Sequence, residues 1–277
     1  MSRQRSRTGQ RLSATFAYVQ IVLVLLVLLF PIYWMISSSL KNNVDIIAYP
    51  PRLVAAPTLD NYRNLFTNYP FVRYTINSFV IVFGSTGLGL LLGVPAAYAA
   101  ARYRMQSYAF LTLVARMAPG ILFLIPWYVI AINLHLTDSY ISLIAAHTVV
   151  TMPVIIWLMI SFFEELPVEV EESALIDGCS RIQVLTHIAL PMSLPGLSVS
   201  AILAFIFSWN YFLFALVLSG FNTAPLTVAA FNFIGVAAID WGGLMAAATV
   251  ICLPPLILLL FVQRWLVRGL TAGAVKG

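Results

Sequence analysis

The sequence predicts an all-α integral membrane protein with six transmembrane helices. Of its 277 residues, 61% are hydrophobic and only 9% are charged, whereas soluble domains are about half apolar and about a quarter charged. A helix needs about 20 mainly apolar residues to cross a hydrocarbon core about 30 Å thick. Six stretches of the chain meet this requirement, namely 14–39, 77–101, 108–132, 140–163, 194–218 and 244–267.

The first stretch, 14–39, follows several arginines, as the apolar core of a secretory signal does. It is longer than such a core and has no small-residue cleavage site. We therefore interpret it as a membrane helix preceded by an N-terminal tail, 1–13. The membrane domain then covers 14–267, and a C-terminal tail covers 268–277.

The basic residues predict the orientation of the chain, because short cytoplasmic loops are enriched in Lys and Arg. With both termini inside, the inner side carries the larger set, and the outer side carries only Lys41, Arg52, Arg63 and Arg73. Membrane topology accounts for the net charge of +5 without a nucleic-acid partner. The inner set consists of Arg3, Arg5, Arg7, Arg11, Arg102, Arg104, Arg181, Arg264, Arg268 and Lys276.

The distribution of ionisable groups bears on what drives the protein. Transporters coupled to ion gradients usually carry such groups at membrane depth, but the acids here avoid the six spans. His147 and Arg116 are the exceptions: the first is either a packing residue or a proton relay, and the second can snorkel or bind a carbonyl. A phosphate-binding loop ends in Lys, and neither lysine has that context. Any ATP must therefore bind to a separate chain, and we expect no catalytic residues, bound cofactor or metal site here.

An acidic loop, 164–191, separates the fourth and fifth spans. Pro167 suits the first turn of a helix, and Gly178 can adopt the left-handed conformation that ends it. Ser180 followed by Gln183 resembles a capping box that begins a second helix, which we expect to stop before Pro191. The loop should form a compact helical elbow, acidic enough to attract a basic partner because it holds one arginine against Glu164, Glu165, Glu169, Glu171, Glu172 and Asp177.

The elbow resembles the EAA motif of ABC importer permeases at seven positions, Glu172, Ser173, Ala174, Gly178, Ile188, Leu190 and Pro191. Only Ser173 departs from the family, which most often has Ala there. The resemblance implies the type I ABC importer permease fold and a helix that docks on an ATPase subunit. Glu172 would pair with a basic residue of that subunit, and the coupling set would extend to Glu171 and Asp177. The alternative is a solvated amphipathic linker.

Over nearly its whole length the chain resembles the maltose-type permeases of the carbohydrate importer branch. The end of the chain, 269–277, is similar to that family's tail, which inserts between the ATPase subunits. The tail residues expected there are Thr271, Gly273, Lys276 and Gly277. A disordered terminus is the alternative.

Four residues are candidates for the solute pathway. Trp127 and Tyr128 could stack on sugar rings or pack against other helices. Trp209 could line the pathway or simply pack, and the Asn210 amide could bind a sugar hydroxyl or a neighbouring helix. In the resembling family the outer loop 221–240 reaches into the binding protein, so its candidates are Asn222, Thr223, Asn232 and Asp240.

The sequence thus predicts the permease subunit of an ABC importer for a small sugar or polyol, working by alternating access. Its expected partners are a second, homologous permease, two ATPase subunits carrying ATP and Mg²⁺, and an extracytoplasmic sugar-binding protein. It should lie in a bacterial or archaeal inner membrane with both termini in the cytoplasm. The alternatives are an importer permease for a non-sugar solute and an ATP-independent secondary transporter.

Overall fold

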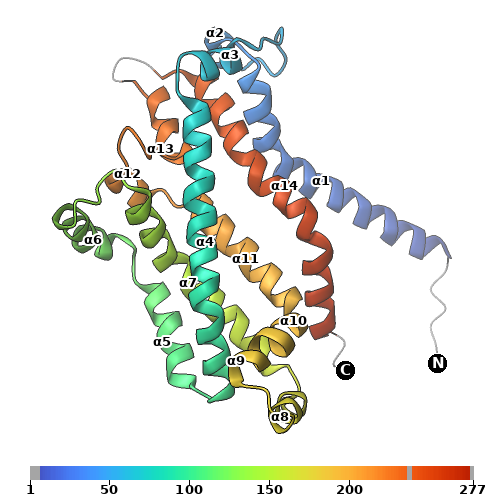
Figure 1. Cartoon of the computed structure of the whole chain (residues 1–277). Helices are drawn as coiled ribbons and strands as arrows, with labels where there is room; N and C mark the ends of the chain where they lie inside the picture. The colour runs from blue at the N-terminus through green and yellow to red at the C-terminus, as the bar shows by residue number, and fades with distance from the viewer. Residues whose placement is uncertain (1–6, 236–238, 275–277) are drawn as a thin grey trace. The chain divides into compact units, whose positions relative to one another are not determined.

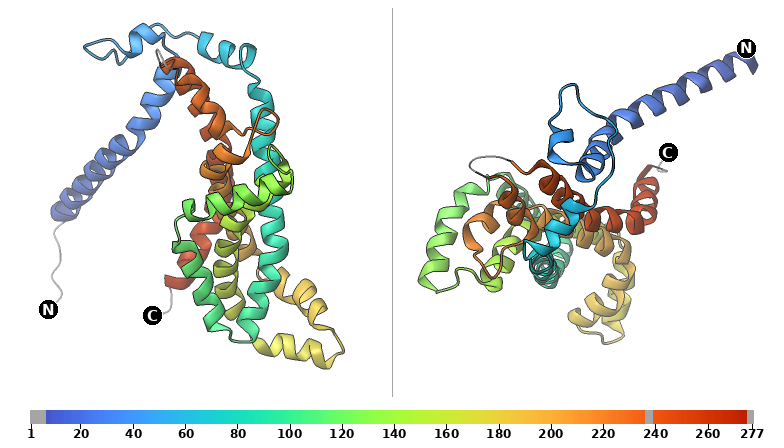
Figure 2. Two further views of the ribbon diagram at one scale, coloured as in Figure 1. Left: turned by 90° about the vertical axis from the view of Figure 1, so that its left-hand side faces the viewer. Right: turned by 90° about the horizontal axis from the view of Figure 1, so that it is seen from above.

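A computed structural model describes residues 7–235 and 239–274 of the chain (Figures 1 and 2). It divides into two compact units: unit 1 comprises 1–69 with 233–250, and unit 2 comprises 70–232 with 251–277. Within the described ranges the regular structure is helical, apart from an isolated β-bridge between Ile234 and Ile239. The predicted all-helical class is therefore confirmed.

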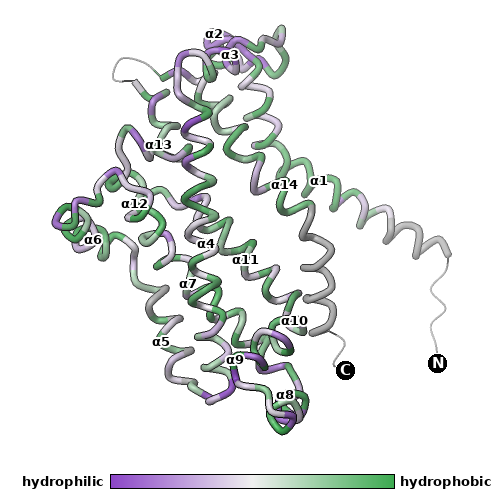
Figure 3. Tube along the Cα trace, in the orientation of Figure 1, coloured by the Kyte–Doolittle hydropathy of each residue, from purple (hydrophilic) through white to green (hydrophobic). Residues whose placement is uncertain are grey.

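In the part of the chain that the structure describes, four single helices are long and apolar enough to cross a membrane. They are α1 (Arg7–Ser39), α4 (Phe71–Arg102), α7 (Tyr140–Glu164) and α14 (Trp241–Ala274). A fifth span can be counted from a pair of helices bent by 83°, Arg181–Met192 and Leu194–Trp209. In Figure 3 the hydrophobic residues follow these helices, whereas hydrophilic residues gather around α2, α3 and α8. The shorter elements are α2 (Asn43–Ile46), α3 (Asp60–Thr67), α5 (Gln106–Met117), α6 (Ile121–Asn133), α8 (Val168–Ile176), α9 (Arg181–Val184), a π-helical turn (Leu185–Ala189), α10 (Leu190–Met192), α11 (Leu194–Trp209), α12 (Leu213–Leu218), α13 (Leu226–Ala229) and a 3₁₀ turn (Ala230–Phe233).

Two of the predicted spans are not continuous helices. The stretch 108–132 is divided because α5 ends at Met117 and Ala118 is extended, with ψ at 126°. Ala118 precedes Pro119, and the residue before a proline is driven out of the helical region. The stretch 194–218 is divided at Asn210, where α11 ends before α12 begins at Leu213. The Asn210 amide donates to the carbonyl of Ile206 at 2.8 Å, a local hydrogen bond that competes with helix continuation.

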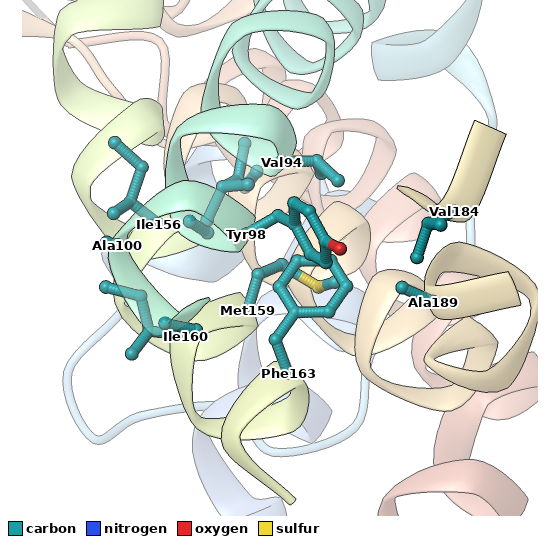
Figure 4. Packing of buried hydrophobic residues seen from close by; sticks show 13 residues of the cluster. Val94, Tyr98, Ala100, Ile156, Met159, Ile160, Phe163, Val184 and Ala189 are labelled. Carbon is teal, nitrogen blue, oxygen red and sulfur yellow. The ribbon is translucent and has the colours of Figure 1, made fainter. Parts of the chain in front are cut away.

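The core of unit 2 is the contact between α4 and α7. Small residues let the two backbones approach, as is common between helices in membranes. A Cβ on Gly89 would lie 2.9 Å from Ile155 Cδ1, so a larger side chain there would force Ile155 or its neighbours to shift. Around this contact Ile155 is fully buried, as are Met159 and Phe163, whose side chains are drawn in Figure 4. A second cluster, with Leu143, Phe214 and others, packs α12 and α6 against the opposite end of the same pair.

Polar contacts organise unit 1. Asn61 donates its side-chain amide to the carbonyls of Ser39 and Lys41, both at 2.8 Å. The Lys41 ammonium donates in turn to the carbonyls of Arg52 and Leu53, at 2.8 and 3.0 Å. The C-terminal end of α1 is therefore held by the loop that follows it.

We predict that Gly89→Val destabilises the protein by about 1–3 kcal/mol, since it forces a larger side chain into a close-packed contact. The measurement is the midpoint of thermal unfolding of the purified protein in detergent. The matched control is Gly87→Val on the same helix, because a Cβ on Gly87 has no neighbour within 4 Å. Equal midpoints for both variants would contradict the proposed packing.

Candidate functional site

The candidate site is the elbow, 164–191, whose two predicted helices are both present. Pro167 precedes α8, and Gly178 follows its end with φ at +92°, a left-handed conformation that suits glycine. The capping box is confirmed: Ser180 Oγ accepts from the Gln183 backbone N–H at 3.3 Å, and Gln183 Oε1 accepts from the Ser180 backbone N–H at 2.7 Å. Local chemistry therefore sets the turn between the helices.

The second helix does not stop before Pro191, contrary to our prediction. It continues from α9 through the π-helical turn into α10, which contains Pro191 in its first turn and ends at Met192. Pro191 removes one backbone donor from this continuous run of helix, so it is tolerated only where the hydrogen-bond pattern is interrupted. The wider π turn resets the hydrogen-bond register immediately before it.

The inner face of α8 carries a buried carboxylate. Glu171 is only 2% exposed and forms an ion pair with Arg102 at the C-terminal end of α4. Arg102 Nε donates to both carboxylate oxygens at 2.9 Å, and the Tyr98 hydroxyl donates to Oε2 at 2.7 Å. Burial raises the pKa of the Glu171 carboxyl, but these hydrogen bonds and the Arg102 charge outweigh burial and hold the pKa below its ordinary value.

The outer face of the elbow combines acidic and apolar groups. Glu172 and Asp177 are exposed on either side of Ile176, which is 85% exposed, and Ile182 on the next helix is 75% exposed. Exposed large apolar side chains flanked by polar groups are typical of interaction surfaces. We call Glu172, Ile176, Asp177 and Ile182 the docking face. The sequence pattern indicated its two acids but not its isoleucines.

The other residues that the resemblance assigned to coupling lie in the interior or at the rim of the elbow. Ser173 donates its hydroxyl to the Glu169 carbonyl at 2.8 Å. Ala174 and Leu190 are half-buried against the core cluster, which includes Val184 and Ala189 of the second helix. Ile188 is half-buried, and Pro191 is exposed. Figure 4 shows Val184 and Ala189 facing the rings of Tyr98 and Phe163.

The four pathway candidates do not gather into one site within this chain. Trp127 packs on Phe214 with ring centroids 6.3 Å apart, and Tyr128 is 39% exposed. Trp209 is buried and donates its indole N–H to the Ile251 carbonyl at 3.0 Å. Asn210 is exposed while bonded to its own helix.

The loop 219–226 is organised by Asp138, a residue that the sequence analysis did not select. Its carboxylate accepts from the backbone N–H groups of Gly220, Asn222 and Thr223 at 2.9, 3.1 and 2.9 Å. The Asn222 amide and the Thr223 hydroxyl donate to it as well, at 2.9 and 2.7 Å. Partial burial raises the pKa of the Asp138 carboxyl, but these hydrogen bonds outweigh it and lower the pKa below its ordinary value.

The remaining candidates lie elsewhere. Asn232 is exposed, whereas Asp240, in unit 1, accepts from the Asn43 amide at 2.9 Å. Thr271 and Gly273 fall within α14, and Lys276 and Gly277 lie outside the described residues. Across 7–235 and 239–274, no three His, Cys, Asp or Glu side chains are grouped as metal ligands.

A buried polar cluster joins three helices of unit 2. His147 Nδ1 lies 2.9 Å from Ser208 Oγ, which lies 2.8 Å from Ser85 Oγ. The His147 ring also meets the Tyr211 ring edge-on, with centroids 5.6 Å apart. The cluster therefore ties α4, α7 and α11 together.

The chain thus combines a bundle of apolar helices with an exposed acidic elbow. The model of one protein family, binding-protein-dependent transport system inner membrane component, matches residues 86–272. The chain belongs to this family of ABC transporter permeases. It is 39% identical to a probable ABC transporter permease of Sinorhizobium fredii, with 100% of this chain and 99% of that one covered.

Other relatives carry more specific names. The permease of a sulfoquinovosyl glycerol transport system from Agrobacterium fabrum is 37% identical, with 90% and 89% of the two chains covered. That of a trehalose transport system from Mycobacterium tuberculosis is 35% identical, with 95% and 98% covered. A solved bacterial ABC transporter that imports the polysaccharide alginate matches with a TM-score of 0.79 at 20% identity, covering 95% and 99%, and shows the shared fold.

We predict that Asp138→Asn loosens the loop 219–226. Because the folded pKa lies below the unfolded value, the Asp138 carboxylate contributes stability above about pH 4, and this is lost as the pH falls through the folded pKa. Amide exchange of 219–226, corrected for its intrinsic pH dependence, should rise in the wild type as the carboxylate protonates. In Asp138→Asn it should be faster and independent of that titration. If exchange of 219–226 in the wild type did not change with pH, the role assigned to Asp138 would be contradicted. Asp60→Asn is the control, because it removes an acid that does not contact this loop.

Proposed function

We propose that this chain is the permease subunit of an ABC importer for a small sugar or polyol. The support is the agreement of its full-length relatives, among which sulfoquinovosyl glycerol, trehalose and diacetylchitobiose transport permeases are named. A second, homologous permease would complete the pathway. Substrate passes by alternating access between the two subunits.

The docking face is the single feature on which the mechanism rests. Glu172 and Asp177 supply negative charge, and Ile176 and Ile182 supply apolar area that water disfavours. A basic, apolar groove on an ATPase subunit fits both properties. ATP and Mg²⁺ bind to that partner, and closure of two ATPase subunits moves the elbow.

The rest of the assembly follows from this arrangement. The elbow and both termini lie in the cytoplasm, the chain lies in an inner membrane, and an extracytoplasmic binding protein delivers the sugar. The outer loop faces that protein with Asn222, which is exposed, whereas Thr223 is buried and holds the loop to Asp138. Hydrogen bonds to Asp138 hold the loop in place, and the exposed Phe221 ring of this loop lies against the Arg73 guanidinium.

The two alternatives differ in what the membrane interior must contain. A secondary transporter needs an ionisable group at membrane depth, and the polar cluster around His147 is the candidate for that role. A non-sugar importer would keep the docking face and change the transported solute. The named relatives favour the sugar.

We predict that Glu172→Lys lowers ATPase association by about tenfold or more, because a like-charge contact at an interface costs several kcal/mol. The measurement is the amount of ATPase subunit retained on the purified, reconstituted complex. Glu164→Lys is the control, since Glu164 is exposed outside the docking face. Full retention of the ATPase subunit on Glu172→Lys would contradict the coupling role.

We also predict that a sugar stimulates ATP hydrolysis by the wild-type complex in lipid with its binding protein. Trehalose, sulfoquinovosyl glycerol and diacetylchitobiose are the test compounds, with methionine as the non-sugar. Stimulation by a saccharide alone supports the proposal. Stimulation by methionine alone would replace the sugar with another solute, and transport that needs no ATP would favour the secondary transporter.

A further inference from the structure

The pair Arg102–Glu171 joins the elbow to a membrane-spanning helix that is not its neighbour in sequence. We propose that Glu171 is a positioning residue that locks α8 to the C-terminal end of α4 through Arg102 and Tyr98, so that displacement of the elbow is passed directly to α4. This inference rests on the proposed function, in which an ATPase subunit moves the elbow. It assigns the two adjacent acids opposite tasks, with Glu172 facing the partner and Glu171 facing the bundle.

The geometry of the contact makes it a stiff one. Both Glu171 oxygens accept from Arg102 Nε at 2.9 Å, Arg102 Nη2 donates to Oε1, and the Tyr98 hydroxyl donates to Oε2 at 2.7 Å. Tyr98 and Arg102 are one helical turn apart, so they present both donors from the same face of α4. A carboxylate held by several charge-assisted bonds keeps one orientation as well as one position.

Burial gives the contact its strength. Glu171 and Arg102 side chains are only 3% and 10% exposed, so water competes weakly for either charge. Separating the pair would leave two buried charges without partners, which is strongly unfavourable. The elbow and the end of α4 should therefore move together rather than part.

An apolar contact extends the same connection into α7. The Tyr98 ring meets Phe163 edge-on, with centroids 5.4 Å apart, and Phe163 is fully buried at the end of α7 (Figure 4). The Arg102 guanidinium also lies 5.7 Å from the centre of the Tyr98 ring. Glu171 is thus fixed to the tightly packed pair of helices at the core of unit 2.

The chain path explains why such a lock is needed. The backbone links the elbow only to α7, through 165–167, and to α11, beyond α10. The backbone does not join the elbow directly to α4, and a Cβ on Gly178, just after the end of α8, would have no neighbour within 4 Å. Through this polar contact, a movement of the docking face should be transmitted directly to α4.

The test is hydrogen exchange of the whole transporter in lipid, with and without ATP, Mg²⁺ and vanadate. Two segments report: the elbow, 164–191, and the end of α4, 93–105. In the wild type both should respond to nucleotide. In Glu171→Gln, nucleotide should still change hydrogen exchange in the elbow. The nucleotide-dependent change at the end of α4 should fall by about tenfold, which is one logarithmic unit in an equilibrium constant. Glu169→Gln, an exposed acid on the same helix, should keep both responses.

A second variant guards against misfolding of Glu171→Gln. Tyr98→Phe removes one hydrogen bond and leaves the ion pair in place, and it should weaken the α4 response about threefold, less than the charge-removing variant does. An undiminished α4 response in both variants would overturn the inference. A missing elbow response in the wild type would instead refute the proposed function, so the two failures are distinct.

Discussion

The packing of α4 against α7 is the constraint on which unit 2 depends. In hydrocarbon, helices gain little from burying apolar surface, so they associate through close contact and interhelical hydrogen bonds. Gly89 permits that contact beside Ile155, and Ser85 supplies the polar link that brings Ser208 of α11 to the pair. The elbow then attaches to the same two helices through Tyr98 and Phe163. The other elements of the unit named here, α11 and the elbow, are positioned by packing on this pair of helices.

Two carboxylates in this unit, the buried Glu171 and the half-buried Asp138, are each matched by several hydrogen-bond donors. Glu171 is satisfied by Arg102 and Tyr98, and Asp138 is satisfied by the backbone and side chains of the loop it organises. Both acids lie just outside the membrane-spanning segments, where a charge costs less than at the centre of the bilayer. Charge is therefore used to fasten loops to helix ends, and the spans are joined by hydroxyl groups and packing.

The elbow has two faces because α8 is short. A helix of nine residues has little stability of its own and depends on tertiary contacts. The inward residues Glu171 and Ala174 provide those contacts, which frees Glu172 and Ile176 to face outward. An element built this way can be exposed to a partner and still be held by the bundle. That combination is what a moving contact between two subunits requires.

The sequence by itself determined the features whose causes are local. Long apolar stretches such as 140–163 become helices because unpaired backbone groups are intolerable in lipid. Ser180, Gln183 and Gly178 set the elbow turn because caps and left-handed glycines act within a few residues. The breaks at Ala118 and Asn210 also have local causes. They were missed because a span predicted from the hydropathy of about 20 residues does not register a single position that interrupts the helix.

Only the tertiary structure decided how neighbouring residues of one type divide their roles. Glu171 and Glu172 are chemically identical, and their difference arises from the rotation of α8 about its axis, which the packing against α4 sets. Tyr98 and Arg102 could be read as one face of a helix, but their partner lies about 70 positions further along the chain. Asp138 and loop 219–226 meet in the same way. Such pairings depend on long-range geometry, and no periodicity within a single helix encodes them.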